Sequence, residues 1–267
     1  MKQCFGVLAL LAVAIILAHP PATFSSAGPD EARAILDQTL DRKYQDLELK
    51  VHLVKTSKTG KERPMDLTVK MKNSPEMKKT LAVFTAPPEV AGITSLAWDY
   101  TDPAQTADRW FKLSGMEYVK CLGQSCQNLE EKFGFSTDIF AINLDEADHK
   151  LLGEETIDGA PCFKIESKAK DQGNPAGARF ITWVDKEKLV ARKVEVYDKT
   201  GTLSQMSVFT EFKLLGGHWW ETKGELAQYN TGKKLRFEIT EANVNTGIPD
   251  AVFDKPKVFS VQGDGKP

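Results

Sequence analysis

The stretch that decides the fold is LELKVHL at residues 47–53, together with MDLTVKM at residues 65–71. Both segments alternate apolar and polar residues without interruption, which is the pattern of a β-strand with one buried and one solvated face. Shorter segments of the same kind recur as far as residue 244. A large antiparallel sheet with one apolar, concave face can enclose an apolar ligand. The pattern therefore favours a carrier of apolar cargo over an enzyme.

The same pattern predicts roughly ten or eleven strands joined by short turns. The expected strands are residues 47–54, 65–71, 80–85, 93–99, 109–121, 162–167, 179–184, 190–197, 203–212, 219–229 and 234–244. Consecutive strands with short connections favour an up-and-down antiparallel sheet, and so wide a sheet curls under its own twist. We therefore expect a mainly β protein built on an open, strongly curved antiparallel sheet, an unclosed barrel.

Two helical segments are expected to cover this sheet. Residues 29–40 begin with acidic residues that suit a helix N-terminus, and they carry an apolar stripe of Ala32, Ile35, Leu36 and Leu40. Residues 128–144 lose the alternating pattern and predict short helices or a packed loop. The N-terminal helix and this short helical insertion form the expected lid.

The first 27 residues have the features of an export signal. Lys2 is followed by an apolar run from Val7 to Ala18, and small residues precede a cleavage site near Ala27. The run is short for a membrane span, although an uncleaved anchor is the alternative. Cleavage removes one of the 35 basic residues and none of the 37 acidic ones, so the net charge becomes 34 − 37 = −3. We expect a periplasmic protein that binds no nucleic acid.

Three cysteines follow the predicted signal. Cys121 and Cys126 flank Gly123, a natural turn residue, and in an oxidising compartment they are expected to form a disulfide. A metal site is the alternative, but no further cysteine or histidine partner lies nearby in the sequence. Cys162 lies in a strand pattern and is expected to be a small buried residue.

No arrangement of residues predicts catalysis, a metal site or a cofactor. The histidines His52, His149 and His218 are scattered, and we expect Asp148 and His149 to lie in a solvated loop. Paired acidic residues such as Glu154 and Glu155 are expected in charged surface turns rather than as catalytic carboxylates. No nucleophile motif is present. We therefore expect a protein that is not an enzyme.

Several motifs resemble the periplasmic outer-membrane lipoprotein-sorting proteins, the LolA-like family. They are FTAPPEVAGITSLAW at 84–98, KLLGEETIDG at 150–159, WVDK at 183–186, VEVYDKTG at 194–201 and NTGIPDAVF at 245–253. The resemblance covers roughly residues 30 to 255 and implies one half-barrel domain, residues 28–267 after the signal. It also implies an apolar cavity for lipoprotein acyl chains or another lipid, with inner- and outer-membrane transport proteins as partners.

The alternating pattern of the predicted strands indicates which apolar residues line this cavity. They are Leu49, Val51, Leu53, Leu67, Val69, Leu81, Val83, Trp98, Trp110, Phe180, Val208 and Phe237. A one-residue error in register moves a whole strand's side chains to the opposite face. The expected function is transfer of lipid toward the outer membrane by a monomer without cofactor or metal. The alternative is a non-enzymatic envelope module that binds a peptide or a membrane transporter.

Overall fold

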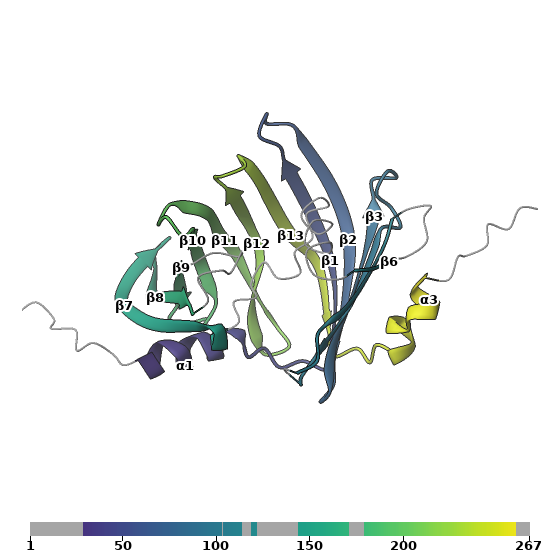
Figure 1. Cartoon of the computed structure of the whole chain (residues 1–267), viewed down its shortest axis with the longest axis horizontal. Coiled ribbons are helices and arrows are strands. Elements are labelled where there is room, and N and C mark those ends of the chain that lie inside the picture. The colour runs from purple at the N-terminus through teal and green to yellow at the C-terminus, as the bar shows by residue number, and fades with distance from the viewer. Residues whose placement is uncertain (1–28, 103, 114–118, 122–143, 171–178, 260–267) are drawn as a thin grey trace, which may run out of the picture.

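The computed structural model describes residues 29–102, 104–113, 119–121, 144–170 and 179–259 (Figure 1). The predicted signal at residues 1–27, all but the last residue of the predicted helical insertion, and Cys126 lie outside these residues. The helices are α1 (Pro29–Leu40), the 3₁₀ turns η1 (Leu144–Glu146) and η2 (Asp250–Phe253), and α3 (Lys255–Phe259). Within this part of the chain, no helix is long and apolar enough to cross a membrane.

The described strands form a single sheet of 13 strands. They are β1 (Asp46–Thr56), β2 (Glu62–Asn73), β3 (Met77–Ala86), β4 (Thr94–Tyr100), β5 (Asp108–Lys112), β6 (Val119–Cys121), β7 (Ala147–Ile157), β8 (Ala160–Ala169), β9 (Arg179–Asp185), β10 (Ala191–Tyr197), β11 (Leu203–Leu215), β12 (His218–Gln228) and β13 (Lys233–Val244).

The sheet consists of two meanders that meet at its centre. Strands β1 to β6 follow one another to one edge, and β13 back to β7 follow one another to the other. The first and last strands, β1 and β13, pair antiparallel and join the two halves, with a bulge between Lys50 and Val51. All neighbouring strands are antiparallel, and among the described strands β6 and β7 are the two edges, so the sheet does not close into a barrel. The predicted open antiparallel sheet is confirmed.

The strands number 13 rather than ten or eleven for a local reason. Residues 109–121 were expected as one strand, but β5 ends at Lys112 and β6 begins at Val119. Residues 147–157, which were not expected as a strand, form the edge strand β7. This segment carries charged residues, among them Asp148 and Glu154. The predicted N-terminal helix is confirmed as α1, and the break expected at Pro87 lies directly after β3.

The two faces of the sheet follow from its register, because paired residues on neighbouring strands point to the same face. Leu53 pairs with Met65 on β2 and with Phe237 on β13, so these three side chains share one face. We call it the α1 face, because α1 packs on it, and the opposite one the α3 face. In Figure 1, α3 lies on the side of β3 and β6 that points away from the rest of the sheet. The α1 face is therefore the inner face of the curve.

Candidate functional site: the apolar inner face

The central strands give the α1 face a continuous apolar surface. Its buried members are Leu47, Leu49, Leu53, Met65, Leu67, Ala82, Phe84, Phe111, Trp220 and Leu235. A second set of side chains on the same face is only partly buried: Val51, Val69, Met71, Leu226, Phe237, Ile239, Ala242 and Val244. Because this second set retains apolar area that water can reach, it gains free energy when an apolar ligand covers it.

Helix α1 covers the α1 face at its β7–β9 end (Figure 1). Ala32 and Leu36 on the helix are buried against Ile165 of β8 and Val184 of β9. The apolar stripe of the helix sequence is therefore the surface that docks on the sheet. Leu40, the last member of that predicted stripe, is 45% exposed and takes no part in this cluster.

The segment after α1 is fixed to the sheet by charge and ring contacts. The Arg42 guanidinium lies 2.5 Å from the carboxylate of Glu221, which also accepts a hydrogen bond from the Ala191 backbone N–H at 3.0 Å. The same guanidinium lies 4.7 Å from the centre of the Trp220 ring, and Tyr44 packs on that ring. These contacts set where α1 leaves the sheet.

A buried carboxylate joins the start of β1 to the segment after β13. Asp46 accepts hydrogen bonds from the backbone N–H groups of Thr246 at 2.8 Å and Gly247 at 3.0 Å. Burial by itself raises the pKa of Asp46, but the backbone hydrogen bonds from Thr246 and Gly247 outweigh burial and lower this pKa. The ionised carboxylate of Asp46 is therefore the form that links the start of β1 to the segment after β13.

Among the described residues, two hydroxyl groups on the α1 face have no hydrogen-bond partner. Thr182 on β9 is paired with Ile165 and Val194 in the register, and Thr222 on β12 lies two residues from Gly224, which pairs with Phe237. Both threonines are buried, and neither Oγ1 atom meets an acceptor or donor within the described part of the chain. Buried polar groups are normally bonded, so these two hydroxyls are exceptions within the core beneath the α1 face.

A family model described as an uncharacterized protein matches residues 76–258, which is more than half of the chain. The chain belongs to this family. No curated protein matches its sequence.

Solved structures show that the fold is LolA-like. A DUF1329 family protein from Desulfovibrio piger is 23% identical with a TM-score of 0.73, over 86% of this chain and 97% of that one. A putative outer membrane lipoprotein-sorting protein domain from Vibrio parahaemolyticus is 18% identical with a TM-score of 0.73, over 86% and 99%. A LolA superfamily protein from Nitrosomonas europaea is 16% identical with a TM-score of 0.59, over 85% and 98%. The predicted resemblance to lipoprotein-sorting proteins is confirmed for the fold.

The LolA-like sheet divides the twelve predicted lining residues between its faces. Those on the α1 face are Leu49, Val51, Leu53, Leu67, Val69, Phe180 and Phe237. Those on the α3 face are Leu81, Val83, Trp98, Trp110 and Val208. The first four of this second group pack with η2 and α3, which supply a second apolar cover that the strand pattern does not reveal. As lining residues of a cavity, all twelve stay predictions.

One histidine lies where the sequence does not place it. His149 is buried in β7 on the α1 face, and its two ring nitrogens lie 2.8 Å from Ser167 Oγ and from the Leu144 carbonyl oxygen. Since a carbonyl can only accept, Nε2 donates its proton to Leu144, and Nδ1 is hydrogen-bonded to the Ser167 hydroxyl. The expected solvated loop is wrong, because these two partners satisfy a buried imidazole.

The remaining polar predictions have the following outcomes. Cys162 is buried with a free thiol, as expected. The predicted Cys121–Cys126 disulfide depends on Cys126, which lies outside the described residues. Across the described ranges, no group of three or more histidine, cysteine, aspartate or glutamate side chains is placed to hold a metal ion.

Proposed function

We propose that this protein is a carrier that binds the acyl chains of a lipoprotein or of another lipid on its α1 face. The observation that carries this proposal is the apolar surface of the central strands, part of whose side chains stay partly exposed between buried neighbours. Each methylene that such a surface buries contributes about 0.8 kcal/mol before the costs of ordering the ligand. An acyl chain of about fifteen carbons thus gains roughly ten kcal/mol without covalent chemistry.

The features of the first 27 residues support a periplasmic location for this activity. An apolar run behind Lys2, with small residues before the cleavage site near Ala27, is typical of exported proteins. A lipoprotein-sorting domain and a LolA superfamily protein are among the structures similar to this chain. Both considerations support transfer toward the outer membrane, with inner- and outer-membrane transport proteins as the partners.

Native mass spectrometry of the protein released by osmotic shock, without detergent, tests the proposal. The expected spectrum contains an adduct with the mass of a lipid or lipoprotein and a chain shortened by the signal. Val69→Asp places a charge on the α1 face and is expected to remove the adduct. Thr68→Asp, one residue away on the α3 face, is the matched control and is expected to keep it.

Circular dichroism and a cooperative thermal transition establish that each variant folds. Should Val69→Asp fail to fold, Val69→Thr adds a hydroxyl with little change in volume and is expected to weaken uptake of an added diacyl lipopeptide. A wild-type protein that carries no adduct and takes up neither lipid nor lipopeptide contradicts the carrier proposal. That outcome favours the envelope interaction module, whose partner then binds equally well in the presence of lipid.

A further inference from the structure

The hairpin between β11 and β12 carries apolar side chains on both faces of its tip. Leu214 pairs with Trp219, and Leu215 pairs with His218 across the turn. Leu215 packs with Trp220 on the α1 face, so Leu214 and Trp219 point to the opposite, α3 face. Leu214 is 59% exposed, the largest exposed fraction among the large apolar residues that the structure describes, and Trp219 is partly exposed. The tip is therefore apolar on a face that water reaches.

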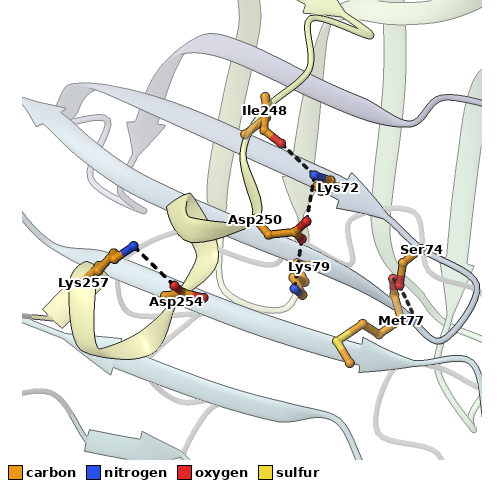
Figure 2. Close-up of polar contacts among 8 residues, drawn as sticks. All are labelled: Lys72, Ser74, Met77, Lys79, Ile248, Asp250, Asp254 and Lys257. Atoms are coloured by element: carbon orange, nitrogen blue, oxygen red, sulfur yellow. Dashed lines mark hydrogen bonds and ion pairs between the residues drawn. The ribbon is translucent and has the colours of Figure 1, made fainter.

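The apolar residues of the α3 face over β3 to β5 have a cover that the hairpin tip lacks. Elements η2 and α3 lie over them, and Figure 2 shows how this cover is fixed. Lys72 on β2 donates to the Ile248 carbonyl at 2.8 Å and to the Asp250 carboxylate at 3.1 Å. Lys79 on β3 reaches the same carboxylate at 3.2 Å. Leu214 has no comparable cover among the described elements, as its exposure shows.

The hairpin tip is held in a fixed shape. Gly216 and Gly217 have φ values of +59° and +86°, as a tight two-residue hairpin turn requires. A Cβ atom at Gly216 would lie 2.7 Å from Val244 Cγ1, so the turn packs directly on the end of β13. The indole N–H of Trp220 donates to the Leu215 carbonyl at 3.2 Å. Because the tip is already ordered, a partner that binds it does not bear the cost of ordering it.

The charged groups beside the tip carry a small positive excess. Lys188, in the turn between β9 and β10, places its ammonium 5.2 Å from the centre of the Trp219 ring. Other cations near this turn already pair with carboxylates: Lys186 and Arg192. Among the described residues, Lys188 and Lys213 make no ion pair, and neither does Glu187 in the same turn as Lys188. Two ammonium groups and one carboxylate leave one positive charge.

A lipid bilayer fits this surface better than a folded protein does. One leucine and one indole at a hairpin tip offer a small apolar area, which a fluid bilayer takes up without a preformed pocket. Indole rings and lysine side chains both favour the level of the lipid headgroups, where an apolar body and a polar end are satisfied together. The single excess charge adds a modest attraction to anionic lipid.

We propose that the tip of the β11–β12 hairpin docks this protein on the surface of a phospholipid bilayer. Leu214 and Trp219 enter the boundary between headgroups and acyl chains, and Lys188 and Lys213 meet the phosphates. This inference rests on the proposed carrier function, because it names the membrane as the partner with which the same apolar surface exchanges its cargo. Leu215 packs with that surface from the other face of the tip, so docking brings the bilayer next to it.

Sedimentation with protein-free vesicles tests this docking, with the whole protein released by osmotic shock. The vesicles contain either phosphatidylcholine alone or equal parts of phosphatidylcholine and anionic phosphatidylglycerol. Binding to both is expected, roughly fivefold tighter to the anionic vesicles. Leu214→Asp is expected to weaken binding at least about tenfold. Leu152→Asp makes the same change at an exposed leucine of β7 and is expected to preserve binding.

Uptake of an added diacyl lipopeptide, followed by native mass spectrometry, separates the docking from the carrier function. Leu214→Asp is expected to take up the lipopeptide as the wild type does. Val69→Asp is expected to lose this uptake and still to bind vesicles. Uptake by the wild type without vesicle binding overturns the docking and leaves the carrier function standing. Vesicle binding without uptake supports the docking and contradicts the carrier function.

Two further outcomes overturn the docking. One is equal vesicle binding by Leu214→Asp and the wild type, with circular dichroism establishing that the variant folds. Leu214→Ser makes the same comparison without a new charge, should Leu214→Asp not fold. The other is binding only to membranes that retain their own proteins, which indicates a protein partner rather than the bilayer.

Discussion

The guanidinium of Arg42 and the carboxylate of Glu221 lie 2.5 Å apart although 179 residues separate them in the chain. Their ion pair joins the segment after α1 to β12, the strand that also carries Trp220. Glu221 is only 5% exposed, so its charge depends on protein partners rather than on water. The position of α1 over the inner face is therefore coupled to one buried ion pair.

Replacing Arg42 with alanine is expected to lower the free energy of unfolding by about 3 kcal/mol, because Glu221 then stays buried with an uncompensated charge. Urea unfolding followed by circular dichroism measures this loss. Arg33→Ala, which removes exposed ion pairs with Asp37 and Asp145, is the control and is expected to leave the midpoint nearly unchanged. Equal losses in the free energy of unfolding would show that the buried ion pair stabilises the fold no more than the exposed ones.

Asp46 is expected to make stability depend on pH. Its pKa is lowered in the folded state, so its contribution is complete above the unfolded value of about 3.9 and is lost as pH falls through the lower, folded pKa. Asp46→Asn should therefore be less stable than the wild type at pH 7, with a difference that shrinks in strong acid. Urea midpoints at several pH values measure it, with Asp148→Asn at an exposed position as the control. A difference that persists unchanged at low pH would contradict this account.

Gly224 is expected to tolerate no side chain. A Cβ atom there would lie 2.6 Å from the Val208 carbonyl oxygen and 2.9 Å from each of the rings of Phe209 and Phe237. Gly224→Ala should cost about 1–3 kcal/mol, because the backbone contact cannot move aside cheaply. Glu225→Ala, on the next residue and the opposite face, should change stability by no more than about 0.5 kcal/mol. Thermal unfolding of both variants measures these losses, and equal losses would contradict the prediction.

Phe253 is expected to anchor η2 and α3 on the sheet. Its side chain is completely buried beneath these elements, and Phe253→Ala should cost about 3 kcal/mol by leaving a cavity. Hydrogen exchange should accelerate in residues 250–259 before it does so in the strands. Val252→Ala, whose side chain is only partly buried, is the milder comparison. Unchanged exchange in η2 and α3 would show that the lysine contacts alone hold this segment.

The strands were predictable where one face of the sheet is apolar and the other polar. Residues 47–53 alternate without interruption, and Leu47, Leu49 and Leu53 are buried on the α1 face. The pattern is informative there because the opposite face, with Glu48 and Lys50, meets solvent. Local sequence is enough when a single face decides burial.

The face was not predictable where both sides of the sheet are covered. Residues 81–84 read LAVF, and Leu81 packs under η2 and α3 whereas Ala82 packs on the α1 face. An unbroken apolar run has no polar residue to mark the outer face. The lining predictions at Leu81, Val83, Trp98 and Trp110 therefore fall opposite those at Leu53 and Leu67.

By itself, the sequence determined most of the strands, the N-terminal helix and the family resemblance, because alternation, capping charge and turn residues act over a few neighbours. Only the tertiary structure decided that β1 pairs with β13, that Arg42 meets Glu221, and that His149 is buried with Ser167 and Leu144. Most of these contacts join distant parts of the chain, and each depends on how the sheet curls. Their energy comes from desolvation and geometry, which no local pattern records.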